Sequence, residues 1–248
     1  MSERLNILGI WVDPVDRYEA INRVEEFLQK GGRPHTVFAA NPEKSFSVPK
    51  DPQLLETFRT ADLLLPDGAG IVWAARILYG ARLARVPGSE FIFDICEIAE
   101  KKSSGIFVYG AKESTNRAAV EILKRKYPAL KIVGRSNGYV KDSEFPILID
   151  QINNSHAEIL FLALGSPKQE NWFARHHRKL KYIKVCQCIG GTLDTIAGNV
   201  KRAPAAWQRF SLEWLYRLIS QPSRIKRQKI LPLFIIAILK MKLKHLIR

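Results

Sequence analysis

The sequence comprises 248 residues, of which 46% are hydrophobic, and it includes 15 glycines and 13 prolines. This composition is typical of a globular chain with one substantial core, and it excludes a low-complexity chain. Three cysteines, Cys96, Cys186 and Cys188, lack the spacing of zinc ligands, so we expect buried thiols. The formal net charge of +15 is uneven: residues 201–248 contain twelve Lys or Arg and one acid, which gives +11, and residues 1–200 hold the remaining +4. The basic C-terminal segment therefore predicts contact with a polyanion, either a nucleic acid or an anionic membrane surface.

The N-terminal residues do not predict secretion. The apolar stretch at residues 5–12 is too short for a signal peptide, and Asp13 and Pro14 follow it at once. We therefore expect a cytoplasmic protein.

Along residues 1–200, short apolar runs bounded by Gly, Pro or Asn alternate with segments of helical periodicity. The expected strands lie at residues 5–12, 36–40, 105–109, 131–133, 158–164 and 183–189. The expected helices lie at residues 16–30, 51–58, 68–79, 89–101, 114–127, 144–154 and 167–175. This alternation predicts a Rossmann-like α/β core at residues 1–200, with a mostly parallel sheet and helices on both faces, followed by an amphipathic helical appendage at residues 201–248. In such a sheet, ligands bind in the loops that follow the carboxyl ends of the strands.

Two of these loops carry polar side chains. Asn41 follows the second expected strand, and its amide can bind a sugar hydroxyl or a base edge, or cap the helix that begins near Pro42. Asp67 follows the apolar stretch at residues 63–65 and precedes a helix whose N-terminus would stabilise its ionised form. An Asp-Gly pair is also often only a turn and a cap. Both residues are candidates for binding or catalysis at the same edge of the sheet.

A third loop predicts an anion site. Gly165 and Ser166 leave an expected strand, and the next helix begins at Pro167. Backbone N–H groups and the helix dipole would therefore face a bound anion, and Gln169, in the first helical turn, can face the same site.

Two weaker loops place small residues at strand ends, which lets a phosphate approach the backbone. They contain Tyr109 and Gly110, and Gly190, Gly191 and Thr192. Neither loop matches the dinucleotide fingerprint or the Walker loop, so a redox cofactor or ATP gains little support. The sequence also lacks an Asp-x-Asp motif, a His pair at metal spacing and a Gly-x-Ser-x-Gly motif, which argues against a catalytic metal and an activated serine.

The basic segment also carries an apolar stripe. Trp207, Phe210, Trp214, Leu215 and Leu218 recur at intervals of three and four, and residues 230–239 are apolar apart from one proline. Ten residues are too few to cross a bilayer, so we expect this run to lie in the interface of an anionic membrane. Alternatively, the stripe packs on the protein's own core or on another subunit. Nucleic acid is disfavoured, because an RNA groove would not place so apolar a run beside its charges.

Six motifs in register resemble those of the WecG/TagA/CpsF glycosyltransferases, which form glycosyltransferase family 26. The motifs are Asn41-Pro42-Glu43, Pro66-Asp67-Gly68, Gly165-Ser166-Pro167-Lys168-Gln169-Glu170, Gly190-Gly191-Thr192, Val200-Lys201-Arg202-Ala203-Pro204, and the stretches 212–217 and 220–224 taken together. The resemblance covers essentially the whole chain. It implies an inverting, metal-independent transferase without a cofactor, which moves N-acetylmannosamine from a UDP-sugar donor to a polyprenyl-diphosphate-linked N-acetylglucosamine acceptor. The products would be precursors of teichoic acid or of related surface polysaccharides.

The resemblance also implies roles for single residues. Asp67 would be the general base that takes the proton from the acceptor hydroxyl. Arg85 would contact a phosphate of the donor or the acceptor, unless it is a solvated surface charge. The glycine loops and Gln169 would stabilise the charge that develops on the leaving UDP.

By the same resemblance, the C-terminal appendage docks on the inner face of the cell membrane and completes the active site. Arg217, Arg224 and Arg227 match its arginines and would clamp a diphosphate, while Trp214 would help hold the enzyme at the bilayer. Off the membrane, a homo-oligomer would hide the apolar face. Ala39 departs from the family, whose members often have Thr there. The transferred sugar therefore stays open between N-acetylmannosamine, its uronic acid and glucose.

Two other classes of function remain open. A dinucleotide-dependent oxidoreductase shares such a sheet but would need the missing fingerprint. A noncatalytic adaptor between a membrane surface and a partner would use the basic segment without needing Asp67.

Overall fold

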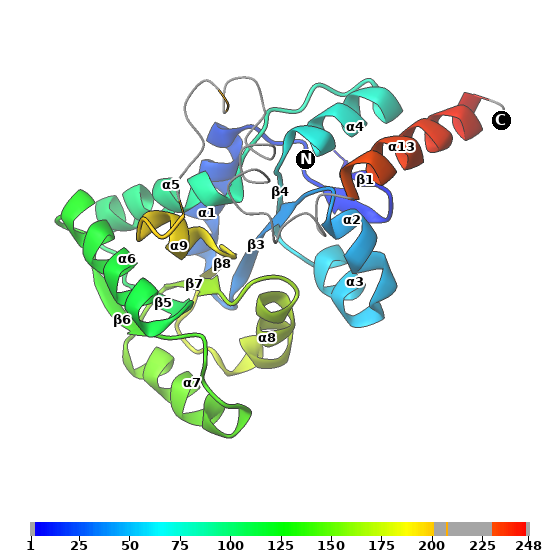
Figure 1. Ribbon diagram of the computed structural model, residues 1–248. Helices are drawn as coiled ribbons and strands as arrows, with labels where there is room; N and C mark the ends of the chain where they lie inside the picture. The colour runs from blue at the N-terminus through cyan, green and yellow to red at the C-terminus, as the bar shows by residue number, and fades with distance from the viewer. Residues whose placement is uncertain (1–2, 201–206, 208–229, 247–248) are drawn as a thin grey trace.

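The computed structural model of the chain describes residues 3–200, 207 and 230–246. At its centre is a six-stranded sheet in the order β4-β3-β8-β7-β5-β6, in which all neighbouring strands are parallel (Figure 1). The strands are β3 (His35–Ala40), β4 (Leu63–Pro66), β5 (Ile106–Gly110), β6 (Ile132–Ser136), β7 (Ile159–Ala163) and β8 (Val185–Cys188). The α/β fold with a parallel sheet, predicted from the alternation of strands and helices, is confirmed.

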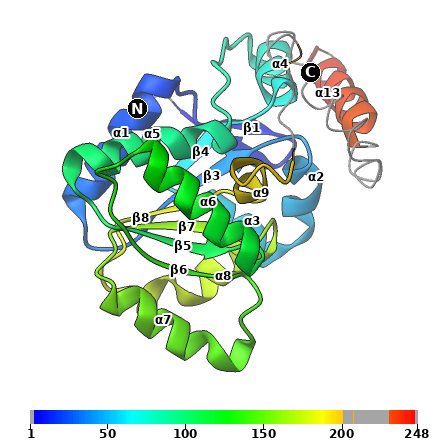
Figure 2. The same ribbon diagram turned by 60° about the vertical axis from the view of Figure 1, so that its left-hand side comes forward.

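Helices cover both faces of this sheet, as Figures 1 and 2 show. One face packs against α1 (Arg17–Lys30), α5 (Gly88–Lys102), α6 (Glu113–Lys126) and α9 (Thr192–Ile196). The other face packs against α2 (Lys44–Ser47), α3 (Pro52–Arg59), α4 (Ala69–Tyr79), α7 (Phe145–Asn154) and α8 (Lys168–His176). Short 3-10 turns, η1 (Val48–Lys50), η2 (Asp142–Glu144) and η3 (His177–Lys179), join some of these helices.

Each face of the sheet has its own hydrophobic core, because successive side chains of a strand point to opposite faces. On β7, Ile159 and Phe161 pack with the first group of helices, whereas Leu160 and Leu162 pack with the second. All four side chains are buried. This two-sided burial explains why the central strands read as continuous apolar runs in the sequence.

Five predicted helices start one residue later than expected, because the expected first residue is the N-cap, and in α1 and α3 this residue is an aspartate. The Asp16 carboxylate accepts a hydrogen bond from the Glu19 amide at 2.8 Å, and Glu19 closes a capping box. The Asp51 carboxylate accepts one from the Gln53 amide at 3.0 Å, with Pro52 as the first helical residue.

One strand prediction was wrong, and one strand was missed. The expected strand at residues 5–12 is an antiparallel hairpin, β1 (Leu5–Ile7) and β2 (Ile10–Val12), which lies outside the main sheet. Leu8 and Gly9 form its turn with φ angles of +51° and +86°, and such two-residue turns suit the twist of a hairpin. The apolar stretch at residues 63–65, expected only as the approach to a turn, is the edge strand β4.

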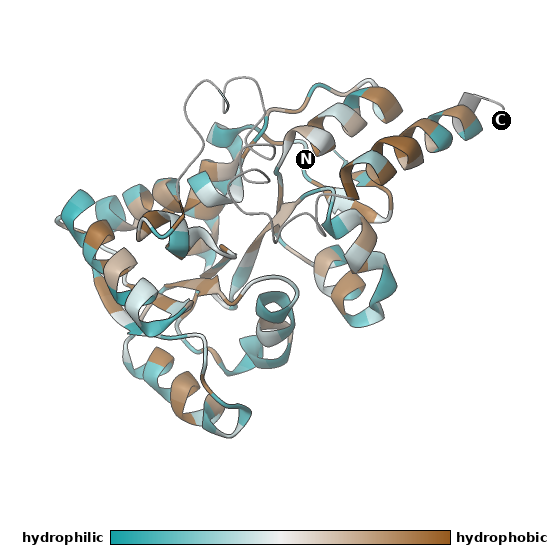
Figure 3. Ribbon diagram, viewed as in Figure 1, coloured by the Kyte–Doolittle hydropathy of each residue, from teal (hydrophilic) through white to brown (hydrophobic). Residues whose placement is uncertain are grey.

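The C-terminal helix α13 (Ile230–Leu246) packs along α4 (Figures 1 and 2). Phe234 and Ile238 are buried on its inner side, whereas Leu233, Leu239 and Leu243 are exposed. Figure 3 shows how apolar the first half of this helix is. In the described part of the chain, no helix has both the length and the apolarity needed to span a bilayer. Trp214, Arg217, Arg224 and Arg227 lie outside the described residues.

Candidate active site at the carboxyl edge of the sheet

The predicted site residues gather where the parallel strands end. Ala40 lies opposite Pro66, Gly110 lies opposite Ala163, and Leu162 lies opposite Cys188 in the strand registers. The loops that follow β3, β4, β5, β7 and β8 therefore start at one edge. From β3 the chain turns to α2 on one face of the sheet, and from the adjacent β8 it turns to α9 on the other. Such a divergence is where open α/β sheets bind ligands.

Asn41 and Asp67 begin two adjacent loops of this edge. The Asp67 amide donates hydrogen bonds to the carbonyls of Ala40 at 3.0 Å and Leu65 at 2.8 Å. The Asn41 side-chain oxygen accepts a hydrogen bond from the Lys44 amide at 3.1 Å, so it caps the first turn of α2, one of the two roles that the sequence left open. The N-cap of α4 is Gly68, with a φ of +89°, so the half-buried Asp67 precedes the capping position.

The Asn41 and Asp67 loops are held together at Gly70. A Cβ atom at this glycine would lie 2.7 Å from Cγ of Pro42, a contact too close for any side chain. The same Cβ would lie 3.6 Å from the ring of Phe234, whose ring centroid is 6.5 Å from that of Phe46 on α2. Helix α13 thus packs directly behind both loops.

The segment that contains Arg85 follows the carboxyl end of β4. The amide of Val86, the neighbour of Arg85, donates a hydrogen bond of 3.0 Å to the carbonyl of Pro66, so this segment runs along the edge strand β4. Arg85 is half-buried and lines a cavity of about 50 Å³ with Arg17 and Asp94, which form an ion pair at 2.8 Å. Burial raises the pKa of Asp94, although the hydrogen bond from Arg17 opposes this.

The glycines of these loops fall into two kinds. Gly165 and Gly190 have φ angles of +76° and +55°, and a Cβ atom at either would meet no atom within 4 Å. Their backbones are therefore open to a ligand, and a turn with positive φ favours glycine. Gly110 differs, because its Cβ atom would lie 2.4 Å from the carbonyl of Ala163. Glycine is needed at position 110 because β5 and β7 pack too closely there for a side chain. Ser166 is exposed beside Gly165, and Gly191 is exposed beside Gly190.

The side chains of Tyr109 and Thr192, two predicted substrate contacts, are buried in the structure. The Tyr109 ring is only 1% exposed, lies 5.2 Å from the Trp172 ring between centroids, and faces the core because it sits on an inward position of β5. Burial raises its pKa to about 12. The buried Thr192 hydroxyl donates a hydrogen bond to the carbonyl of Ile189, so this hydroxyl is already used within the first turn of α9.

Gln169 is also turned inward. It is 3% exposed, its side-chain oxygen accepts a hydrogen bond from the Gly190 amide at 3.0 Å, and its side-chain nitrogen donates to Glu170 at 3.3 Å. Glu170 forms an ion pair of 3.0 Å with Lys44. The sequence analysis missed Lys44 and Glu170. Glu170 was named there only as the last residue of the motif at residues 165–170, and its position three residues before Phe173, on the same side of α8, was a further signal.

The three cysteines are buried thiols, as predicted. Burial raises the pKa of Cys96 to about 12 and raises the pKa of Cys188 well above its ordinary value. Within residues 3–200, 207 and 230–246, no three His, Cys, Asp or Glu side chains come together as metal ligands.

The amino edge of the sheet holds a larger hollow, of about 720 Å³. Several of its polar side chains are already paired: Arg33 contacts Asp62, Lys184 contacts Glu158, and the His177 ring contacts a carbonyl of its own helix. It also lies at the end of the sheet that is opposite to Asn41, Asp67 and the glycine loops. We therefore place the site at the carboxyl edge.

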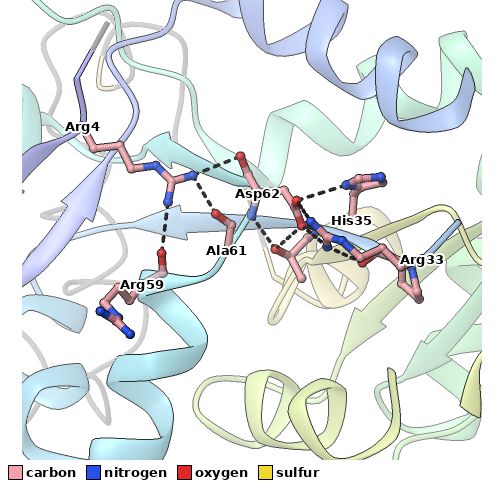
Figure 4. A network of polar contacts seen from close by, with 8 residues as sticks. Arg4, Arg33, His35, Arg59, Ala61 and Asp62 are labelled. Atoms are coloured by element: carbon pink, nitrogen blue, oxygen red, sulfur yellow. Dashed lines mark hydrogen bonds and ion pairs between the residues drawn. The ribbon is translucent and has the colours of Figure 1, made fainter. Parts of the chain in front are cut away.

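Asp62 is the centre of a network of polar contacts at this amino edge (Figure 4). Its carboxylate accepts hydrogen bonds from the Arg33 guanidinium at 2.9 Å and from the Thr36 amide at 2.9 Å, and it lies 3.1 Å from Nδ1 of His35. Arg4 donates to the carbonyl of Asp62 at 3.1 Å. Burial alone would raise the pKa of Asp62, but the hydrogen bonds from Arg33, Thr36 and His35 lower it below its ordinary value.

Comparison with known proteins identifies the family of the chain. The family model described as "Glycosyl transferase WecG/TagA/CpsF family" matches residues 5–248. Two similar proteins, from Bacillus spizizenii (strain W23) and Bacillus subtilis (strain 168), are both named N-acetylglucosaminyldiphosphoundecaprenol N-acetyl-beta-D-mannosaminyltransferase. Each is 36% identical over 204 residues, which cover 82% of this chain and 78% of the relative. The chain with Asp67 and the glycine loops at one edge of its sheet therefore belongs to the WecG/TagA/CpsF family of glycosyltransferases.

Proposed function

We propose that the protein transfers N-acetylmannosamine from a UDP donor to N-acetylglucosamine on a polyprenyl diphosphate, in the synthesis of teichoic acid or a related surface polysaccharide. The observation that carries this proposal is the position of Asp67. It follows the edge strand β4, next to the Asn41 loop and at the same edge of the sheet as the open glycine backbones, in a chain of this family. The names of the two relatives support the choice of sugar and acceptor.

Asp67 is the general base of this reaction. Its carboxylate takes the proton of the acceptor hydroxyl as the oxygen attacks the anomeric carbon from the side opposite to UDP, and the configuration inverts. A positioned base contributes about two to four powers of ten in rate. Half-burial at the edge of the sheet keeps Asp67 reachable while limiting its motion.

The charge that develops on the leaving UDP is stabilised by the protein itself, without a metal ion. Donors aimed at a developing charge lower the barrier most when they are fixed in advance. The backbone amides around Gly165 and Gly190 lie in loops that leave room for a phosphate, and Arg85 supplies a cation beside β4. Asn41 stays a proposed contact through its amide nitrogen, because its oxygen caps α2.

The C-terminal segment brings the enzyme to its lipid acceptor on the inner face of the membrane. The outer side of α13 exposes Leu233, Ile236, Leu239 and Leu243, and Lys240 and Lys244 flank them. An apolar stripe with lysines beside it suits an anionic bilayer surface. Arg217, Arg224 and Arg227 then clamp a diphosphate, and Trp214 sits in the interface. A second copy of the chain is the other way to cover this stripe.

The transfer reaction is tested with a panel of UDP-sugars and a short-chain prenyl-diphosphate N-acetylglucosamine acceptor. We expect UDP release that depends on the acceptor and is fastest with UDP-N-acetylmannosamine. Faster release with its uronic acid or with UDP-glucose would replace the donor but keep the reaction class. Absence of release with every donor would overturn the proposal and favour a noncatalytic adaptor.

The membrane surface is tested by flotation with vesicles that contain an anionic lipid. Leu239→Ser combined with Leu243→Ser should lower binding by about tenfold or more, because each exposed leucine that enters the interface contributes on the order of 1 kcal/mol. Ile147→Ser, an equally exposed residue on α7, is the matched control and should leave binding unchanged. Equal binding by both variants would contradict the role of α13, and a change in oligomeric state alone would favour the second copy.

A further inference from the structure

An ion pair lies buried beneath the carboxyl edge. The Lys44 ammonium is 3.0 Å from the Glu170 carboxylate, and the two side chains are 7% and 0% exposed. The ammonium also lies 4.9 Å from the centre of the Phe58 ring, in the apolar core under α2 and α3. Removing two charges from water costs several kcal/mol per ion, and hydrophobic residues of the same volume often stabilise a protein as well or better. Stability alone therefore does not explain the pair.

Hydrogen bonds continue from this pair into three loops. The Lys44 amide donates to the side-chain oxygen of Asn41 at 3.1 Å, which is the start of the loop after β3. Gln169, in the first turn after the β7 loop, donates to the Glu170 carboxylate at 3.3 Å. The Gly190 amide, in the loop after β8, donates to the Gln169 oxygen at 3.0 Å. One continuous chain of contacts thus joins the ends of three adjacent strands.

The chemistry of the partners fixes the orientation of Gln169. An ionised carboxylate only accepts hydrogen bonds, so Glu170 requires the amide nitrogen of Gln169. A backbone N–H only donates, so Gly190 requires the amide oxygen. Both ends of the Gln169 amide are therefore used within the protein, and Glu170 decides which end faces Gly190.

We infer that Lys44 and Glu170 are positioning residues that act through Gln169 to hold the Gly190 loop, an inference that rests on the proposed function. In that reaction the open backbone of the Gly190 loop lies beside the leaving diphosphate, while the Gly190 amide itself is held by Gln169. A loop held in place before the reaction stabilises the transition state more than the bound substrate. Loss of the pair should therefore lower kcat more than it raises KM for the donor.

The test uses a double variant, Lys44→Met with Glu170→Met, in the full chain. It removes both charges at similar volume, so no unpaired charge stays buried, and its Tm should equal or exceed that of the wild type. Methionine cannot accept from Gln169, so amide hydrogen exchange in the segment around Gly190 should become about tenfold faster or more. The kcat for transfer should fall by about tenfold or more, with the donor KM within about threefold of the wild type.

The matched control removes an exposed ion pair, with Glu56→Met and Arg59→Met on α3. It should leave exchange at Gly190 and kcat unchanged. Gln169→Met is a second variant, which keeps the ion pair and removes only the acceptor of the Gly190 amide. It should reproduce the faster exchange and the lower kcat, and it decides the question if the double variant fails to fold.

Unchanged exchange at Gly190 in these folded variants would overturn the inference, and so would faster exchange with a wild-type kcat. A lower kcat accompanied by a lower Tm in the double variant would also overturn it, because a pair that only stabilises the fold would give this result. The exchange experiment needs no substrate. If the wild type transfers no sugar, the proposed function fails, and Gly190 exchange still reports whether the pair holds the loop.

Discussion

Asp62 and Asp67 lie at the two ends of the same short strand, β4, yet their surroundings differ in kind. Asp62, at the amino edge, accepts hydrogen bonds from Arg33 and Thr36 and lies against His35. Asp67, at the carboxyl edge, stands in front of Gly68 with its positive φ, in a row of loops that include Gly165 and Gly190. Paired charges around Asp62 therefore stabilise the amino edge, whereas the open backbone at Gly165 and Gly190 leaves room for a ligand at the carboxyl edge.

A methyl group added at the carboxyl edge distinguishes a packed glycine from an open one. Gly110→Ala should destabilise the protein by about 3 kcal/mol or more, because the new Cβ would lie 2.4 Å from the carbonyl of Ala163 at a φ of +134°. Urea denaturation measures the effect. Gly165→Ala, in open space at a φ of +76°, is the control and should cost about 1 kcal/mol. Equal losses would mean that both glycines are packed alike.

A second substitution removes the charge of Asp62 at the amino edge. Asp62→Asn should lower the free energy of unfolding by about 2 kcal/mol, because the buried carboxylate loses charge-assisted hydrogen bonds from Arg33 and Thr36. Urea denaturation of the variant and the wild type gives the difference. Glu56→Gln, which removes one partner of an exposed pair, should be neutral. A neutral Asp62→Asn would contradict a stabilising amino edge.

The same variant predicts a pH dependence. The pKa of Asp62 is lowered in the folded protein, so the ionised group contributes stability above the ordinary value of 3.8, and this contribution is lost as the pH falls through the folded value. The difference in unfolding free energy between wild type and Asp62→Asn should therefore be constant from neutral pH to about pH 5 and shrink at lower pH. A difference that grows towards acid pH would reverse the assigned sign.

The smallest expected effect concerns Ala39, which lies two residues before Asn41 and opposite Leu65 in β4. It is half-buried, and a Cβ atom at Gly88 would approach its methyl group to 3.2 Å. Ala39→Thr adds a hydroxyl near the proposed sugar site and should change the ratio of kcat/KM between two UDP-sugars by up to about tenfold. Identical ratios in wild type and variant would place residue 39 outside the sugar contact.

Much of this organisation could be predicted from the sequence, because a strand that is buried on both faces and ends at Gly, Asn or Asp leaves a local pattern. That pattern was enough to place Asn41, Asp67, Gly165 and Gly190 at one edge. It failed for β1 and β2, because an apolar run does not show that Leu8 adopts a positive φ. It also failed for β4, because its three leucines were expected only as an apolar approach to a turn.

The contacts within the site could not be predicted in the same way. The inward direction of Tyr109 depends on which face of β5 the Trp172 ring covers. The pair between Lys44 and Glu170 joins residues that are 126 positions apart, and neither residue differs locally from a surface charge. Such partners are brought together by the order of β3, β8 and β7 in the sheet, which only the folded structure shows.

The most direct test of the account compares the two aspartates of β4 in one transfer assay. Asp67→Asn should lower kcat by about a hundredfold or more and leave the unfolding free energy close to that of the wild type. Asp62→Asn should do the reverse, with a lower unfolding free energy and an unchanged kcat under conditions where it is folded. A wild-type kcat for Asp67→Asn would show that the reaction does not depend on this carboxylate.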